Sequence, residues 1–98
     1  MAPIKDPANA EARALAELAD FSGKRVLEVG CGNGRLTNIY ADRAKLVLGI
    51  DTDEESIREA SKALPRRLEG RVEFRVADIQ SLDVPRQRFD IAFLSWSL

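Results

Sequence analysis

The sequence of 98 residues contains no histidine and a single cysteine, Cys31, and these scarcities exclude several kinds of site. Without histidine, the chain by itself cannot form a Ser-His-Asp or Cys-His catalytic group or most catalytic metal sites. One cysteine permits neither an intrachain disulfide nor a cysteine zinc site. We therefore expect no metal centre in this chain.

Long apolar runs and an excess of one charge are missing as well. No stretch approaches the roughly 20 apolar residues of a membrane span. Residues 1–6 lack the apolar segment of a signal peptide, so we expect a cytoplasmic protein with no membrane partner. The 15 basic residues are balanced by 16 acidic ones. Nucleic-acid-binding proteins usually carry a basic excess on one face, so we expect no nucleic-acid partner.

What is present is a regular alternation of strand and helix patterns. Apolar runs predict strands at residues 26–29, 46–50, 72–76 and 89–96. Helix patterns occupy residues 8–21, about 36–44, and a segment that Asp53 caps and Pro65 ends. Strands that alternate with helices favour a parallel sheet with helices on both faces. Residues 72–76 alternate apolar and charged, which fits the edge of the sheet, while the other three strands fit interior places.

Three acidic residues lie at or near the carboxyl ends of these predicted strands. Glu28 lies in the first predicted strand, Asp51 ends the second, and Asp78 follows the third. In an open parallel sheet, ligands bind at the carboxyl ends of the strands. Asp51 follows the glycine loop at Gly30 by about 20 residues, the spacing at which a carboxylate accepts from ribose hydroxyls. The pattern therefore predicts a site for a nucleoside.

A dinucleotide site is the obvious alternative, and the loop argues against it. The dinucleotide fingerprint is G-x-G-x-x-G, whereas the glycines here are Gly30, Gly32 and Gly34, with Arg35 in the place of the third. The carboxylate of Glu28 would also repel a pyrophosphate, by about 4 kcal/mol for unit charges ~4 Å apart at an effective dielectric constant near 20. The same carboxylate would attract a nucleoside that carries ammonium and sulfonium groups.

Four ordered segments resemble the motifs of the class I S-adenosylmethionine-dependent methyltransferases. Residues 26–37, V-L-E-V-G-C-G-N-G-R-L-T, resemble their motif I, E/D-x-G-x-G-x-G. Residues 49–51 resemble the second motif, residues 72–79 the third, and residues 89–98 the fourth in its small-molecule methyltransferase variant. Each motif alone is weakly specific, but the ordered set is specific.

The resemblance implies the fold and the extent of the domain. The expected fold is α/β, a Rossmann-like three-layer sandwich whose partial parallel sheet has four strands in the order 3-2-1-4 with flanking helices. Residues 1–98 then form one partial domain, with a helical region at 1–22 and a cofactor-binding half-sheet at 23–98. The complete family domain has seven strands, so the resemblance covers about half of it. The fourth strand is then left as an apolar edge.

The resemblance also implies the cofactor and its contacts. S-adenosyl-L-methionine is the expected cofactor and S-adenosyl-L-homocysteine the product. Glu28 would orient the methionine ammonium, and Asp51 would bind both ribose hydroxyls. Asp78 would accept from the adenine amino group, with the Ile79 amide on a ring nitrogen. The full expected cofactor-binding set is Glu28, Gly30, Cys31, Gly32, Asn33, Gly34, Asp51, Thr52, Asp78, Ile79, Leu94 and Ser95.

Several of these residues have simpler interpretations that stay open at this point. Glu28 could cap only loop amides, Asp51 could cap the following helix, although Asp53 is better placed, and Asp78 could be a turn residue. Cys31 is more simply a small residue in a tight loop than a reactive thiol.

Three further features are open in the same way. Tyr40 has the helical spacing of a core residue. Trp96 could stack on a substrate or belong to a core. The arginines Arg66, Arg67 and Arg71 have the composition of a solvated face.

The function implied is methyl transfer to an unidentified, small-molecule acceptor, and no residue is a persuasive general base. The chain could be a fragment, could pair with itself through the strand-four edge, or could be completed by a partner polypeptide. A non-catalytic S-adenosylmethionine-binding or assembly subunit is the alternative function, and a NAD-binding oxidoreductase module is a further one.

Overall fold

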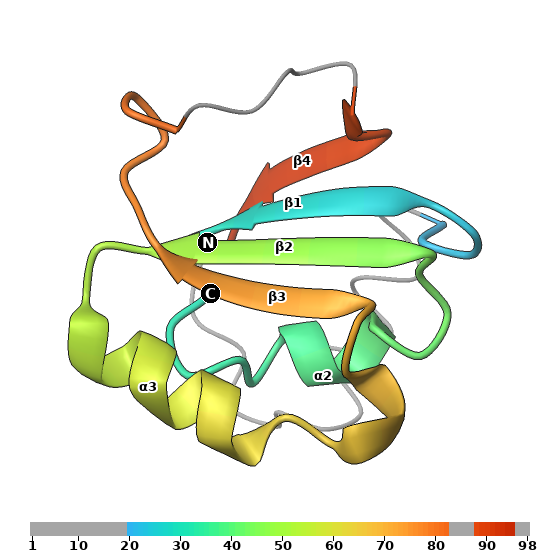
Figure 1. The fold of residues 1–98 in the computed structure, drawn as a ribbon. Helices are drawn as coiled ribbons and strands as arrows, with labels where there is room; N and C mark the ends of the chain where they lie inside the picture. The colour runs from blue at the N-terminus through green and yellow to red at the C-terminus, as the bar shows by residue number, and fades with distance from the viewer. Residues whose placement is uncertain (1–19, 83–87, 96–98) are drawn as a thin grey trace, which may run out of the picture.

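A computed structural model describes residues 20–82 and 88–95, which form one four-stranded sheet. The strands are β1 (Arg25–Val29), β2 (Leu46–Asp51), β3 (Val72–Val76) and β4 (Ile91–Leu94). Every pairing is parallel, and the order across the sheet is β3-β2-β1-β4 (Figure 1). The expected strand order is therefore confirmed, and the fold is Rossmann-like.

One face of the sheet packs against the helices. Helix α3 (Glu54–Ala63) is capped by Asp53, whose side chain accepts from the backbone N–H of Glu55, as the sequence predicted. Its buried residues Ile57 and Ala60 point toward this face of the sheet, where Phe74 of β3 lies close to Ala60 across Gly34. Figure 1 shows α3 and the short helix α2 (Thr37–Tyr40) on the same side of the strands.

The core on this helix-covered face joins the strands to the segment that follows the glycine loop. Tyr40 is fully buried and stacks on Phe21 with ring centroids 4.3 Å apart, while Phe93 of β4 lies edge-on to Tyr40 at 5.8 Å. The expectation that Tyr40 belongs to the core is confirmed. The remaining members of this core are Val26, Leu36, Ala41, Ala44, Val47, Leu68 and Val72.

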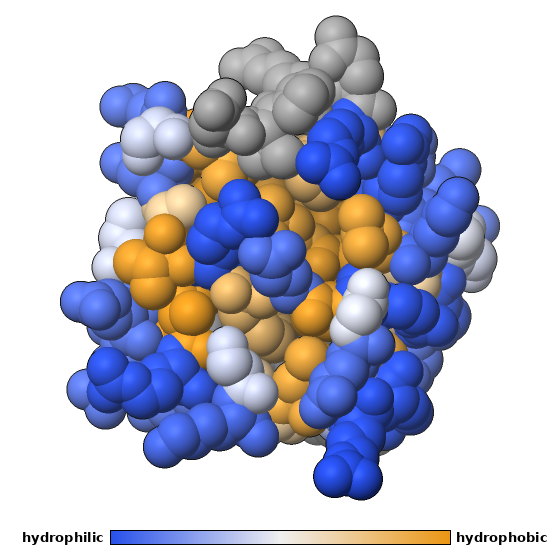
Figure 2. All heavy atoms as spheres, in the orientation of Figure 1, coloured by the Kyte–Doolittle hydropathy of each residue, from blue (hydrophilic) through white to orange (hydrophobic). Residues whose placement is uncertain are grey.

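The opposite face carries the side chains of alternate strand residues. Leu27, Leu48 and Ile50 form its buried cluster, and Phe89 and Leu82 pack against them from the connection between β3 and β4. Figure 2 shows hydrophobic atoms across the middle of the view, interrupted by a few hydrophilic side chains and bordered by others. The described helices lie on the other face, so within residues 20–82 and 88–95 the expected helices on both faces are seen on one face only.

Two sequence expectations about elements change. The helix expected at about 36–44 is helical only over Thr37–Tyr40, and hydrogen-bonded turns such as Arg43 N–H to Tyr40 O complete the segment. Asp20 and Phe21 are not helical, and the rest of the helix expected at 8–21 lies outside the described residues, as does most of the helical region at 1–22. Trp96 also lies outside them.

The arginines expected on a solvated face do more than face solvent. Arg67 forms an ion pair with Asp42, with Nε and Oδ1 2.8 Å apart, and Arg71 donates to the carbonyl of Ala41 at 2.9 Å. Both therefore connect the segment before β3 to the turn after α2. Arg66 belongs to the short 3-10 helix at Arg66–Leu68 and is exposed.

Strand β4 has one neighbour among the described strands, β1, so it forms an edge of the sheet. Among the described strands, β4 therefore has the edge place that the resemblance implied and not the interior place that its composition suggested. Leu94 near its end is 59% exposed. The described parts of the chain contain no helix long and apolar enough to cross a membrane.

Candidate functional site

The loop after β1 is shaped by glycines in left-handed conformations. Gly32 has φ +57° and Gly34 has φ +86°, values that other residues rarely adopt. A Cβ at Gly32 would meet no protein atom within 4 Å, so the space beside this residue is open. The loop is tied to β2, because the backbone N–H groups of Gly30 and Cys31 both donate to the Ile50 carbonyl, at 2.7 and 3.0 Å.

Asp51 connects the glycine loop to the end of β2. Its Oδ2 accepts from the Gly32 N–H at 2.9 Å, and its Oδ1 accepts from the Asp53 N–H at 2.9 Å. The interpretation of Asp51 as the cap of the next helix is wrong, since Asp53 holds that place. A carboxylate has about four acceptor positions. Among the described residues, each Asp51 oxygen therefore keeps one position for a further donor.

Glu28 is fully buried at the end of β1, and three hydroxyl groups donate to it. Thr37 Oγ1 and Tyr40 OH lie 2.7 and 2.6 Å from its Oε1, and Ser95 Oγ lies 2.6 Å from its Oε2. Burial raises the pKa of this carboxyl, and the three hydroxyl donors act in the opposite direction. Among the described residues, Glu28 accepts from no loop amide, so the interpretation of it as a loop cap is wrong.

Two adjoining cavities open where the carboxyl ends of β1, β2 and β4 meet. The smaller, of about 240 Å³, is lined by Glu28, Gly30, Cys31, Gly32, Asn33, Arg35, Leu36, Asp51 and Ser95. The larger, of about 500 Å³, is lined by Val29, Gly30, Ile50, Asp51, Thr52, Ala77, Asp78, Ile79 and Leu94. Gly30 and Asp51 line both, so the two cavities form one elongated site of the size usual for small-molecule ligands.

Eleven of the twelve expected cofactor-binding residues line these two cavities, and Gly34 does not. A Cβ at Gly34 would lie 3.0 Å from Cζ of Phe74 and 3.4 Å from the Cβ of Ala60. Gly34 therefore lets the loop pack against β3 and α3. Gly49 of β2 has a similar place, since a Cβ there would lie 2.9 Å from Phe74 Cδ1 and 3.1 Å from Cys31 Sγ.

Cys31 has the properties of a packed loop residue. Its side chain is buried, and burial together with the charges of Glu28 and Asp51 raises the pKa of the thiol to about 12. A thiol with so high a pKa carries little thiolate at neutral pH and is a poor nucleophile. The simpler interpretation of Cys31 is therefore confirmed.

Asp78 and Ile79 lie at the mouth of the larger cavity. Asp78 Oδ1 accepts from the Gln80 N–H at 2.9 Å, which forms a turn as the simpler interpretation supposed, yet its side chain also lines the cavity. Ile79 is 48% exposed. Both interpretations of Asp78 are therefore compatible with its position.

Sequence reasoning missed part of the site. Arg35 and Leu36 line the smaller cavity, and Val29, Ile50 and Ala77 line the larger. The places of Val29, Ile50 and Ala77 in or beside predicted strands could have indicated these three residues. Thr37 and Tyr40 were missed as polar partners of Glu28, and no sequence signal marks them, because nine and twelve residues separate them from it.

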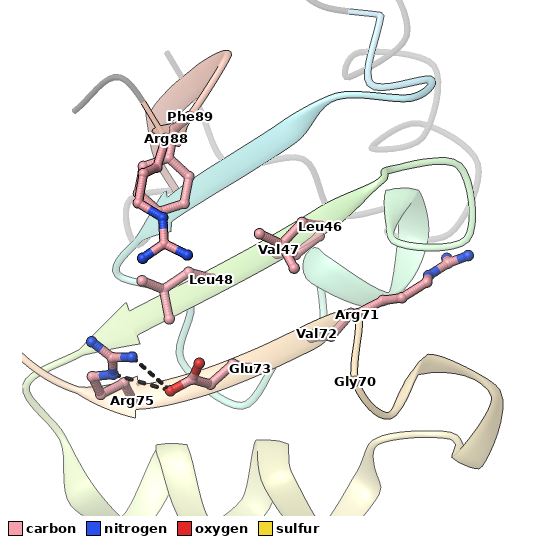
Figure 3. Close-up of a pocket in the computed structure, with 10 residues that line it drawn as sticks. All are labelled: Leu46, Val47, Leu48, Gly70, Arg71, Val72, Glu73, Arg75, Arg88 and Phe89. Carbon is pink, nitrogen blue, oxygen red and sulfur yellow. Dashed lines mark hydrogen bonds and ion pairs between the residues drawn. The ribbon is translucent and has the colours of Figure 1, made fainter. Parts of the chain in front are cut away.

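A third cavity, of about 360 Å³, lies on the face of the sheet without described helices (Figure 3). It is lined by side chains of β2 and β3 and by Arg88 and Phe89. Its charged groups are largely engaged: Arg75 donates to Glu73 at 2.8 Å, and Arg71 donates to the carbonyls of Ala41 and Asp42. This cavity lacks the strand-end carboxylates and glycines of the first two. Within the described ranges, no group of three or more metal-ligating side chains is present.

Comparison with known proteins agrees with the fold and the glycine loop. The sequence profile of the methyltransferase domain family matches residues 26–98. The rRNA N(6)-adenosine-methyltransferase metl-5 of Caenorhabditis elegans is 36% identical over 86 residues, which are 83% of this chain and 40% of that protein. The ubiquinone biosynthesis O-methyltransferase of Coxiella burnetii is 36% identical over 71 residues, 72% of this chain and 30% of that protein.

A solved structure also supports the methyltransferase fold. The S-adenosylmethionine-dependent methyltransferase from Mesorhizobium loti is 30% identical and superposes with a TM-score of 0.71, covering 87% of this chain and 38% of that one. Fold and site define a Rossmann-like nucleoside-binding domain, and the class is that of the class I S-adenosylmethionine-dependent methyltransferases. The chain belongs to the methyltransferase domain family. It spans between 28% and 40% of the length of its first curated relatives.

Proposed function

We propose that this chain binds S-adenosylmethionine at the carboxyl ends of β1 and β2 and supplies the cofactor-binding half of a methyl-transfer reaction. The observation that carries the proposal is Asp51, which lines both cavities and keeps one acceptor position on each oxygen. Two hydroxyl groups on adjacent ribose carbons match two such oxygens. The open space beside Gly32 supports the fit, because a ligand can approach the loop backbone there.

The two ends of the cofactor have different surroundings in this arrangement. The amino-acid end belongs in the smaller cavity, where the Glu28 carboxylate would attract its ammonium. The adenosine end belongs in the larger cavity, where Thr52, Asp78 and Ile79 would contact the adenine. Leu94 lines the same cavity and would pack where the adenosine joins the methionine. Gly30, Cys31, Gly32 and Asn33 would line the ligand chiefly through the loop backbone.

The bound cofactor supplies an electrophilic methyl group on a sulfonium. The chain's own contribution is to hold the nucleoside and the amino-acid end in fixed positions and to keep water away from one side. The rate of reaction between two positioned groups is higher because the groups are already aligned. The acceptor and its base would have to meet the cofactor on the side that these cavities leave open.

We propose a small-molecule acceptor rather than a nucleic acid. The near balance of 15 basic and 16 acidic residues supports this, since a protein that binds a phosphate backbone usually carries a basic excess. The relatives include one protein named for rRNA and one named for ubiquinone biosynthesis, so the family accommodates both kinds of acceptor. Binding of rRNA that weakens steeply with added salt would contradict this part of the proposal.

The cofactor proposal is tested by calorimetric titration of the chain with S-adenosylhomocysteine and, separately, with NAD. The proposal expects saturable binding of S-adenosylhomocysteine and no binding of NAD. Binding of NAD alone would favour an oxidoreductase module and overturn the proposal. Binding of S-adenosylhomocysteine together with transfer of a labelled methyl group supports the enzyme, whereas binding with no transfer to any acceptor supports a non-catalytic cofactor-binding or assembly subunit.

We also propose that the β4 edge pairs with another strand, either of a second copy or of a partner chain. β4 is apolar, its outer backbone groups face no described strand, and Leu94 is exposed beside it. Unpaired apolar edges of this kind favour pairing with another strand.

A further inference from the structure

The buried carboxylate of Glu28 is surrounded by neutral hydroxyl groups. Thr37 and Tyr40 donate to one of its oxygens and Ser95 to the other, at 2.6 to 2.7 Å. These are the short distances of hydrogen bonds from a hydroxyl to an ionised carboxylate. Glu28, Thr37 and Tyr40 have no exposed surface, so water cannot replace these donors.

The three donors come from two separate parts of the fold. Thr37 and Tyr40 project from α2 on the helix-covered face, and Ser95 follows β4, 67 residues from Glu28. The Ser95 hydroxyl has one proton and two nearby acceptors, Glu28 Oε2 at 2.6 Å and the Gly30 carbonyl at 3.1 Å. The shorter distance favours donation to Glu28. The donors from α2 hold one carboxylate oxygen and Ser95 holds the other, and Glu28 still lines the smaller cavity.

The titratable groups around Glu28 leave its charge without a direct cationic partner in the described residues. Arg35 acts on it from the loop through its charge, which lowers the pKa of Glu28. Burial keeps Cys31 and Tyr40 neutral by raising their pKa values, and Asp51 at the end of β2 adds a second negative charge to the same cavity. β4 contributes Ser95, which does not titrate.

We propose that Thr37, Tyr40 and Ser95 are positioning residues that keep Glu28 ionised and oriented beside the smaller cavity, where its charge attracts the ammonium of the cofactor's amino-acid end. This inference rests on the proposed function for the identity of the cation. A buried carboxylate that is solvated by neutral dipoles keeps its charge available to a ligand. One that is neutralised by an arginine ion pair does not.

The first test measures Glu28 without any ligand. The chain is labelled with 13C at the glutamate carboxyl groups, the Glu28 signal is assigned by its loss in Glu28→Gln, and its titration midpoint is measured by NMR. Removing one hydroxyl in Thr37→Val, Tyr40→Phe or Ser95→Ala is expected to raise the midpoint by about one to two pH units, the effect of losing one hydrogen bond to a charged group. A midpoint unchanged in all three variants would overturn the inference.

Two controls separate positioning from general loss of structure. Thr37→Ser keeps the hydroxyl and is expected to keep the wild-type midpoint, so it also serves if Thr37→Val does not fold. Ser56→Ala removes a serine hydroxyl that donates to Asp53 at 2.7 Å, at the cap of α3, and is expected to leave the Glu28 midpoint unchanged. A purely structural role would lower thermal stability without moving the midpoint.

The second test connects Glu28 to the ligand. The affinity for S-adenosylhomocysteine is measured by calorimetry at pH values on both sides of the wild-type Glu28 midpoint found by NMR. It is expected to fall as Glu28 becomes protonated, and to fall at higher pH in Tyr40→Phe and Ser95→Ala than in wild type. If the pH at which the affinity falls did not follow the Glu28 midpoint in these variants, the inference would be overturned. Absence of binding to wild type at every pH would instead contradict the proposed function, while the NMR titration still decides the role of the hydroxyls.

Discussion

Replacing Asp51 with alanine is expected to weaken the binding of S-adenosylhomocysteine by roughly a hundredfold. Two Asp51 oxygens are each engaged by one backbone N–H, at 2.9 Å, and each has one acceptor position left for a ribose hydroxyl. A hydrogen bond to a charged group contributes about 1.5 kcal/mol at the lower end of the usual range, so two contribute about 3 kcal/mol. A loss of about 3 kcal/mol corresponds to roughly a hundredfold in the dissociation constant.

The same substitution also removes the two bonds that hold the loop, so the affinity loss needs to be separated from loop loosening. A ligand analogue without the two ribose hydroxyls makes this separation through a double-mutant cycle. Any difference in the analogue's affinity between wild type and Asp51→Ala then measures loop loosening alone, because the ribose contact is absent from both, and this difference is expected to be smaller than the roughly hundredfold loss for S-adenosylhomocysteine. Calorimetry supplies all four dissociation constants.

A matched control uses an aspartate outside the site. Asp42→Ala removes an exposed carboxylate whose partner is Arg67, and it is expected to leave the affinity for S-adenosylhomocysteine unchanged. If Asp51→Ala bound the ligand as tightly as wild type, or if removing the ribose hydroxyls weakened both proteins equally, Asp51 would not be the ribose-binding residue.

Three other substitutions test the packing, the electrostatics and the edge. Gly49→Ala should lower the free energy of unfolding by about 1–3 kcal/mol, because the new Cβ would lie 2.9 Å from Phe74 Cδ1; unchanged stability in urea unfolding would refute the tight packing. Hydrogen bonds from Arg25 lower the pKa of Asp90 from the ordinary 3.8 to about 2. The ionised Asp90 therefore stabilises the fold above about pH 4, and this stabilisation is lost as the pH falls toward about 2. Asp90→Asn should therefore show a smaller loss of stability than wild type over that range, and equal losses would contradict the assignment. Ala92→Lys places a charge on the exposed β4 edge and should shift an associating wild type toward monomer in light scattering, whereas a wild type already monomeric at high concentration would contradict edge pairing.

The strands could be predicted from the sequence because each is a short segment rich in apolar, branched or aromatic residues. β3 was expected at residues 72–76 and is found at Val72–Val76, since alternation of apolar and charged residues identifies a strand that is exposed on one side. The shortening of the second helix to Thr37–Tyr40 could not be predicted. Leu36 and Tyr40 are spaced as in a helix, but this spacing does not indicate that the helix ends at Tyr40, where turns such as Arg43 N–H to Tyr40 O follow it.

The site was predictable in its carboxylates and less so in their partners. Asp51 and Asp78 stand at strand ends, and parallel strands bring such ends together, so sequence position alone brings them near one another. The burial of Glu28 among three hydroxyls depends on contacts across nine, twelve and 67 residues. No local pattern encodes such contacts. Gly34 shows the converse, because its motif position suggested a ligand contact and its Cβ direction shows packing against Phe74.

A crystal structure of the chain with S-adenosylhomocysteine tests the central claim most directly. The account predicts ribose hydroxyls on the two Asp51 oxygens, the adenine beside Asp78 in the larger cavity, and the amino-acid end in the smaller cavity lined by Glu28. Ligand bound instead in the arginine-lined cavity of Figure 3, or bound with its ribose away from Asp51, would contradict it.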